Sequence, residues 1–167
     1  AASGGTSADA AVAPPPETPD TNPAKFVAPD AAYNAGVGGA IAVDGTTAIV
    51  GARYKDRYSK NSVGAAYLVD TTDASEIDKV VPPSKYRDHG AQFGESVDID
   101  GSLAAVGSRH DNGGNERGAA FLVDTTDGRV VASIDPPIEK MRYFGRFISI
   151  DGDTVAISAH DSDAGEG

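Results

Sequence analysis

Two His-Asp pairs are the residues of this chain best suited to acid–base chemistry. They are His110-Asp111 and His160-Asp161. An imidazole beside a carboxylate is a common general acid–base arrangement. No serine or other nucleophile stands out near either pair, and both pairs fall at the same place in a duplicated pattern. We therefore interpret them as solvated loop residues and predict that the protein is not an enzyme.

The acidic segment at the end of the chain is a candidate metal site. It offers Asp161, Asp163 and Glu166. Carboxylate oxygens at such spacing suit calcium, but the frame differs from the twelve-residue EF-hand loop. The alternative is an ordinary turn on an acidic surface. Calcium is the one cofactor candidate, and no other cofactor is expected.

A basic and aromatic loop is a candidate contact surface. It holds Arg53, Tyr54, Arg57 and Tyr58. Such a loop in an acidic chain could contact a glycan or an acidic patch of another subunit. The alternative is a solvated face whose long side chains lie along the surface.

These residues are positioned by a hairpin that recurs three times. The copies span residues 36–52, 93–108 and 144–159. Each copy has two short apolar runs joined by Asp-Gly, a strong hairpin signal that predicts a type I′ turn. The turn aspartates are Asp44, Asp100 and Asp151. Recurrence at a period of roughly fifty residues is typical of a repeat architecture.

Two further strands follow each of the first two hairpins. GAAYLVDTTD at 64–73 recurs as GAAFLVDTTD at 118–127, and prolines close the next strand in both copies. No segment has sustained helical periodicity. We predict an all-β fold of β-propeller-type blades with four antiparallel strands each, about two full blades plus a third incomplete one. The second strand of each hairpin, rich in small residues, is expected to be buried on both faces.

The predicted domain organisation follows from these repeats. Residues 1–24 form an extended Ala/Pro/Thr-rich arm, and residues 25–167 hold the propeller repeats. Repeat 1 covers about 33–83, repeat 2 about 92–137 and partial repeat 3 about 143–167. Because Lys25–Pro29 matches the proline-closed fourth strands, we predict that it is also a strand.

The repeats resemble the FG-GAP repeat family, found in integrin α subunits and bacterial surface proteins. The matching elements are Phe93-Gly94, Phe144-Gly145 and the Ile-Asp-Gly turns at 99–101 and 150–152. In the first repeat, Ala35-Gly36 is assigned to the Phe-Gly position. The resemblance implies an extracellular or cell-surface role in adhesion or scaffolding. The family's calcium loop between the first two strands is not carried over, because a two-residue turn stands there.

Composition excludes several classes of function. The net charge of −11 argues against nucleic acid and anionic membranes as partners, and the absence of cysteine excludes disulfides. No apolar run is long enough to span a membrane. The chain starts at Ala1, from which we expect a secreted protein whose signal peptide has been removed.

The incomplete third repeat suggests how the protein works. Its predicted edge near Val155 and Ile157 lacks a neighbour, while the predicted strand with Lys25, Phe26 and Val27 lacks the strands before it. An open edge recruits another strand. We therefore expect copies of the chain to assemble head to tail, by donation of the N-terminal strand, into an extracellular filament or scaffold. The alternative is a fragment of a larger surface propeller that binds protein or carbohydrate.

Overall fold

The computed structural model describes residues 24–30, 33–55, 62–87, 90–109, 117–138 and 141–159, and these form an all-β fold. Blade 1 is a four-stranded antiparallel sheet of β1 (Val37–Asp44), β2 (Thr47–Ala52), β3 (Ala65–Asp70) and β4 (Glu76–Val80). Blade 2 repeats this order with β5 (Phe93–Asp100), β6 (Leu103–Ser108), β7 (Ala119–Asp124) and β8 (Val130–Ile134). Blade 3 is the hairpin of β9 (Ile148–Asp151) and β10 (Thr154–Ile157).

The predicted fold class is confirmed. The helical element in the described ranges is the short 3-10 helix η2 (Ser84–Tyr86), between the first two blades. Nothing helical in these ranges has the length and apolar character needed to cross a membrane.

The hairpin turns differ by one residue from the prediction. Asp44 pairs with Thr47 as the last residue of β1, so the two loop residues are Gly45 and Thr46. The turns of blades 2 and 3 have the same register, and the glycines have φ of 54°, 56° and 54°. Positive φ is confined to the first loop residue, whereas a type I′ turn needs it at both. The turn aspartates therefore lie in the strands.

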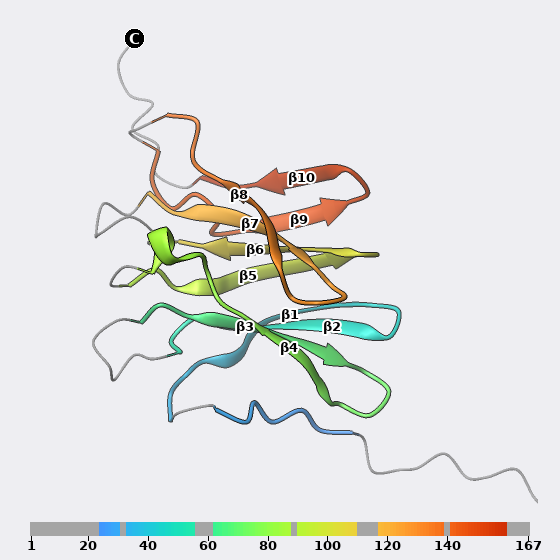
Figure 1. The fold of residues 1–167 in the computed structure, drawn as a ribbon. Helices are drawn as coiled ribbons and strands as arrows, with labels where there is room; N and C mark the ends of the chain where they lie inside the picture. Colours follow the sequence, from blue (N-terminus) through green and yellow to red (C-terminus); the bar gives the residue numbers. More distant parts are fainter. Residues whose placement is uncertain are drawn as a thin grey trace, which may run out of the picture.

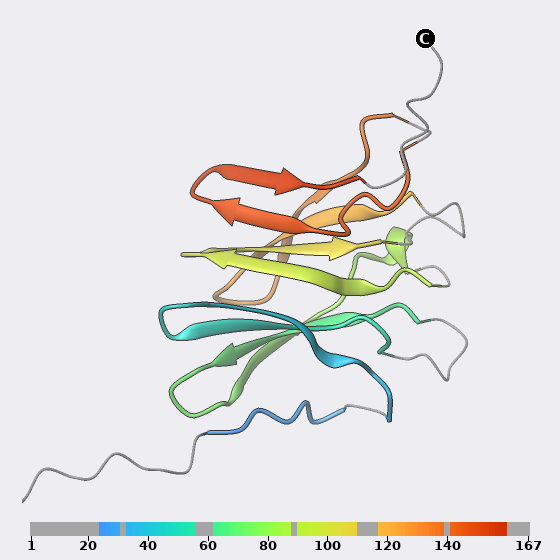
Figure 2. The ribbon, with the colours of Figure 1, turned by 180° about the vertical axis from the view of Figure 1, so that it is seen from behind.

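The blades are stacked face to face (Figure 1). The three hairpins lie one above another with their turns on the same side, and the reverse view shows the same order (Figure 2). The first strands are neighbours: β1 lies against β5, and β5 lies against β9. The main core fills the space between blades 1 and 2, where Phe93 and Phe121 are completely buried and their ring centroids are 5.2 Å apart.

The Phe-Gly motif joins each blade to the one before it. Phe93 donates its N–H to the carbonyl of Val63 at 2.9 Å, and Phe144 donates to the carbonyl of Arg117 at the same distance. In both joints the aromatic residue forms a parallel bridge with a glycine that precedes the third strand, Gly64 or Gly118. The motif thus adds backbone hydrogen bonds to the packing between sheets.

A second glycine allows the backbones of neighbouring blades to approach closely at each of these contacts. Gly51 in β2 and Gly107 in β6 face the carbonyl oxygens of Gly94 and Gly145, respectively. A Cβ added at either position would lie nearer than 3.0 Å to that oxygen. Only glycine therefore allows this approach, which explains the glycine at this place in β2 and β6.

The turn aspartates form a ladder along the stack. Asp44 accepts a hydrogen bond from the Gly101 N–H at 2.7 Å, and Asp100 accepts one from the Gly152 N–H at 2.5 Å. Each carboxylate thus holds the turn of the next blade. Because the acceptor is charged, such a bond is stronger than one between neutral groups.

The structural equivalent of Phe-Gly in the first repeat is Val37-Gly38, so the assignment to Ala35-Gly36 is wrong. Val37 pairs with Ala52 as Phe93 pairs with Ser108, and Gly38 and Gly94 have φ of 84° and 85°. A backbone bond from Gly39 to Gly36 matches that from Glu95 to Gln92. The motif therefore keeps its backbone geometry where valine replaces phenylalanine.

Residues 24–28 form no strand, so the strand expected over Lys25–Pro29 is wrong. Instead the segment covers the face of blade 1 that is turned away from blade 2. Ala28 is buried there, and the Phe26 ring lies 5.6 Å from the Tyr67 ring. The prolines end pairing, as expected, but the apolar residues pack onto a sheet face and not onto a sheet edge.

Candidate functional site

The first strands of the three blades form a groove of about 410 Å³. We call it the first-strand groove. Apart from Arg53, which follows β2, its lining residues come from the first strand of each repeat or directly precede it; the full set is Gly39, Ala40, Ile41, Arg53, Glu95, Ser96, Val97, Arg146, Phe147 and Ile148. Because β1, β5 and β9 belong to separate sheets, the groove runs across three strands and not along one.

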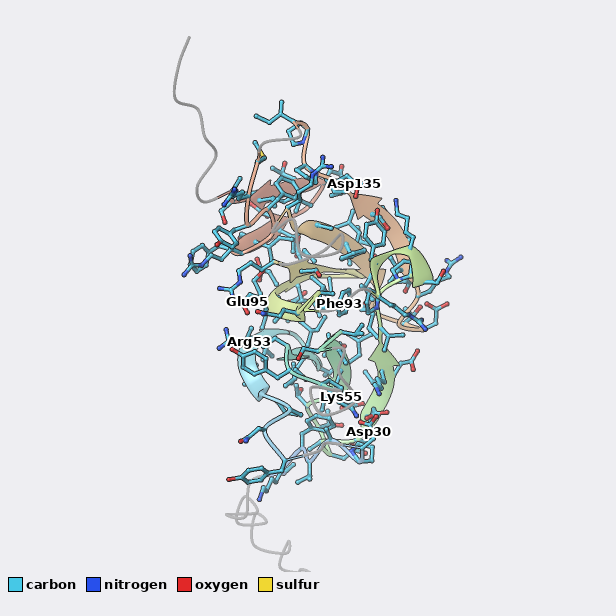
Figure 3. All side chains as sticks on the ribbon, turned by 90° about the vertical axis from the view of Figure 1, so that its left-hand side faces the viewer. Asp30, Arg53, Lys55, Phe93, Glu95 and Asp135 are labelled. Atoms are coloured by element: carbon cyan, nitrogen blue, oxygen red, sulfur yellow. The ribbon has the colours of Figure 1, made fainter. Side chains whose placement is uncertain are left out.

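A buried carboxylate organises the charged side of this groove. Glu95, whose side chain is 8% exposed, accepts a hydrogen bond from Arg53 Nη1 at 2.9 Å. Arg109 Nη1 lies 3.8 Å from the other oxygen of Glu95. Figure 3 shows Arg53 and Glu95 next to each other where blade 1 meets blade 2. One carboxylate is therefore held by guanidinium groups from two blades.

Burial alone would lower the pKa of Arg53. The hydrogen bond and the charge of Glu95 outweigh burial, so the pKa of Arg53 lies above its ordinary value. Its guanidinium is therefore charged at any physiological pH.

Arg109 is fixed by further contacts beside the groove. Its Nη2 donates to Gln92 Oε1 at 3.0 Å, and its guanidinium carbon lies 5.8 Å from the centre of the Tyr143 ring. Its Nε is buried without a hydrogen-bond partner in the described residues.

Arg146 is the second cation that lines the groove. It is half-buried and forms no ion pair with any described residue, although its guanidinium carbon lies 5.5 Å from the centre of the Phe147 ring. The Phe147 side chain is 63% exposed. Among the described residues around the groove, Arg53, Arg109 and Arg146 outnumber Glu95, which gives them an excess of positive charge.

The ends of the stack are a second candidate surface. On β1, at the blade 1 end, Ile41 and Val43 are each 60% exposed. At the blade 3 end, Phe147 and Ala156 are exposed beside a shallow hollow of about 370 Å³. These two faces are equivalent to the two surfaces that meet where one blade packs on the next within the chain.

The blade 3 face has a serine at the joint position. Ser158 stands at the place of Gly51 and Gly107, because Ile157 pairs with Ile148 as Val106 pairs with Val97. Its hydroxyl accepts a hydrogen bond from the Phe147 N–H at 2.9 Å. A Cβ at this place prevents a further blade from approaching as closely as blades 2 and 3 approach their predecessors.

Asp30 fastens the N-terminal segment to blade 1. Its carboxylate accepts a hydrogen bond from the Tyr67 hydroxyl at 2.6 Å, pairs with Lys79, and lies 3.5 Å from Lys55 Nζ. Figure 3 shows Asp30 beside Lys55 at the blade 1 end. Desolvation raises the pKa of Asp30, but the bonds from Lys79 and Tyr67 and the positive charges outweigh it and lower the pKa to about 2.

Comparison with known proteins identifies the repeats. The FG-GAP repeat family matches residues 21–69 and 87–123, which together are more than half of the 167 residues. The chain belongs to the FG-GAP repeat family. FG-GAP repeats are typical of extracellular or cell-surface proteins, and the family is typically non-enzymatic.

Similar solved structures include two designed proteins. The computationally designed Ika4 protein has 10% sequence identity and a TM-score of 0.37, with 78% of this chain and 89% of Ika4 covered. The computationally designed Ika8 protein also has 10% identity, with a TM-score of 0.33 and coverage of 75% of this chain and 43% of Ika8. No curated protein matches the chain.

The sequence-predicted site residues of this FG-GAP chain are distributed unevenly. Arg53 lines the first-strand groove, and Tyr54 follows it with its ring 4.6 Å from the Arg53 guanidinium carbon. Arg57 and Tyr58 lie outside the described residues, as do both His-Asp pairs and the calcium candidates Asp161, Asp163 and Glu166. Within the described ranges, no three histidines or carboxylates gather as a metal site.

The residues predicted to form the assembly interface also lie in two separate parts of the structure. Phe26 packs on Tyr67 within the chain, Lys25 is exposed, and Val27 is 65% exposed. Val155 and Ile157 are half-buried and pair with Ile150 and Ile148, so β10 is less buried than the second strands β2 and β6.

Sequence reasoning missed Glu95, Arg146 and Phe147. Glu95 and Arg146 directly follow the glycines of Phe93-Gly94 and Phe144-Gly145, at the place that Gly39 has in blade 1. Reading the residues that follow Phe-Gly across all three repeats would have indicated charged groups on neighbouring strands.

Proposed function

We propose that the chain is a non-enzymatic extracellular scaffold module that assembles head to tail with copies of itself. The observation that carries this proposal is the chemistry of the two exposed ends. The blade 1 end presents Ile41 and Val43, and the blade 3 end presents Phe147 and Ala156. Since these faces are the two halves of the contact between blades, one copy offers what the next accepts, and such a contact propagates.

The turn ladder supports the same arrangement. Asp151 stands at the place of Asp44 and Asp100, yet no described residue donates to its carboxylate. In an assembly, the Gly45 N–H of the next copy is the matching donor. Ser158 makes this joint looser than those within the chain, so we expect reversible association that Ser158→Gly strengthens.

Mixing two variants tests the proposal. Val43→Glu disables the blade 1 end and Ala156→Glu disables the blade 3 end, and both residues lie outside the first-strand groove. Each variant alone is expected to be monomeric by light scattering, whereas an equimolar mixture forms dimers through its intact ends. Val131→Glu is the matched control, because Val131 on β8 is 45% exposed and belongs to neither end. A wild type that stays monomeric at high concentration would rule out this function.

Donation of an N-terminal strand is a different version of the same assembly. Phe26 and Asp30 are engaged within blade 1, so the donated segment would come from residues 1–23, outside the described ranges. Deleting residues 1–23 abolishes assembly by strand donation but leaves assembly by stacked faces intact. Negative-stain microscopy of both chains distinguishes the two.

The second candidate function is a binding module of a larger surface propeller. One specific observation favours it, namely the positively charged first-strand groove on an acidic molecule. A monomer that binds a glycan or a protein through this groove would support the binding module over the scaffold.

A further inference from the structure

We infer that the first-strand groove binds an acidic sugar chain, with the carboxylate of a uronic acid residue held by Arg146 and the sugar ring placed against Phe147. This inference is carried by two guanidinium groups, one buried carboxylate and one exposed aromatic ring that line a single groove, with Arg109 paired to the carboxylate beside it. The anion-binding Arg146 belongs to neither stacking end, whereas Ile41 and Phe147 line the groove and also lie at the ends of the stack.

Arg146 supplies the anion-binding group. Arg53 and Arg109 both face Glu95, which leaves Arg146 as the groove guanidinium that pairs with no described carboxylate. A guanidinium offers donors in a planar fork that matches a carboxylate, so a bound anion would be held by two parallel hydrogen bonds. Arg53 and Glu95 then remain as a fixed donor and acceptor pair for hydroxyl groups nearby.

The apolar part of the groove indicates a ligand with a hydrophobic face. Phe147 is 63% exposed next to Arg146, with Val97 and Ile148 along the same groove. A pyranose ring has one face of C–H groups and a rim of hydroxyls. It therefore meets both an aromatic ring and the polar groups beside it, as a simple anion would not.

The direction of the groove favours a sugar over a peptide. A bound peptide strand gains affinity from main-chain hydrogen bonds along one sheet edge. Here the groove crosses β1, β5 and β9, which belong to three separate sheets, so no single edge runs along it. Recognition must come from side chains spaced across the blades.

The charges of the described residues favour an anion at this end of the strands. The carboxylates of Asp44, Asp100 and Asp151 lie at the turn end, where the first strands finish. Arg53 follows β2, and Arg146 precedes β9, so both lie at the opposite end of the hairpins. An acidic ligand is therefore drawn to one end of an otherwise acidic molecule, and salt should weaken its binding.

Calorimetric titration of the full chain tests the inference. The probes are trigalacturonate, the neutral trisaccharide maltotriose and the peptide triglutamate. We expect trigalacturonate to bind, more weakly at high salt, and the other two to bind at least about tenfold more weakly. Absence of trigalacturonate binding overturns the inference, and equal binding of triglutamate overturns the assignment to sugar.

Variants locate the binding site. Arg146→Gln is expected to weaken trigalacturonate binding about tenfold, and Arg146→Lys, which keeps the charge but loses the fork, by less. Arg129→Gln is the matched control, because Arg129 is 69% exposed, lies outside the groove and has its guanidinium beside Asp127. Equal affinity of Arg146→Gln and wild type, with both folded by circular dichroism, overturns the site. Arg146 belongs to neither stacking end, so equal light scattering of Arg146→Gln and wild type separates a loss of sugar binding from a loss of head-to-tail assembly.

Discussion

The face of a blade that points toward the N-terminal end of the stack is covered differently in blade 1 and in blade 2. In blade 2 it packs against the whole sheet of blade 1, with Phe93 and Phe121 buried between them. In blade 1 it is covered by residues 24–30 through Phe26, Ala28 and the polar contacts of Asp30. The sheet of blade 1 covers this face of blade 2 up to its first strand, β5. The short N-terminal segment leaves Ile41 and Val43 exposed on the first strand of blade 1, β1. An irregular segment thus replaces a blade over the third strand but not over the first.

Phe93 should account for the largest energetic difference between these two coverings. Phe93→Ala removes a completely buried ring from the joint and is expected to lower the free energy of unfolding by about 4 kcal/mol. Val37→Ala, at the equivalent place in blade 1, should cost about 1 kcal/mol because Val37 is half-buried. Urea unfolding of both variants measures the difference, and similar losses would mean that the joint does not depend on the aromatic ring.

Close backbone contact should have the next largest effect. Gly107→Ala places a Cβ against the Gly145 carbonyl and is expected to cost about 3 kcal/mol. Gly101→Ala meets no atom within 4 Å, and only its φ of +56° opposes it, which costs about 1 kcal/mol. Unfolding midpoints separate steric overlap from backbone strain. Equal losses would show that blades 2 and 3 can move apart without cost.

The turn ladder offers a smaller, matched test. Asp44→Ala removes the acceptor for the Gly101 N–H and should cost about 1 kcal/mol more than Asp151→Ala, which removes an equivalent turn residue with no described donor. Both variants lose the same local turn preference, so their difference isolates the bond between blades. Thermal unfolding of the two at low protein concentration measures it, and no difference would exclude a role of the ladder in stability.

The ionisation of Asp30 should make the stability of the N-terminal covering depend on pH. Its pKa is about 2 in the folded chain, below the ordinary value of 3.8, so the ionised form stabilises the fold. This contribution is fully present above the ordinary value, declines as the pH falls toward 2, and is lost below that. Because the side chain is 44% exposed, solvent screening limits it to about 1 kcal/mol.

Asp30→Asn measures this contribution directly. The variant should be less stable than wild type at neutral pH and equally stable below about pH 2. Comparing urea midpoints of the two chains at each pH cancels the other carboxylates. A difference that persists at low pH would assign the loss to packing and not to charge.

The repeat pattern predicted the all-β fold and the four strands of each complete blade, because alternating apolar runs and turn glycines are local signals. It also placed Arg53 among the candidate contact residues. It did not find Glu95, its partner 42 residues along the chain, since nothing local indicates which charges neighbouring blades bring together. Arg146 and Phe147 were missed for the same reason.

The sequence by itself determined which segments of each repeat form strands, because hydrophobic alternation and glycine act within a few residues of the chain. Only the tertiary structure decided the turn register, the place of Val37-Gly38 as the equivalent of Phe93-Gly94, and the packing of residues 24–30 on a sheet face. These depend on how near one backbone comes to another. At Gly51 and Gly107 a neighbouring carbonyl occupies the place of a Cβ. That approach belongs to pairs of blades and cannot be read from any single repeat.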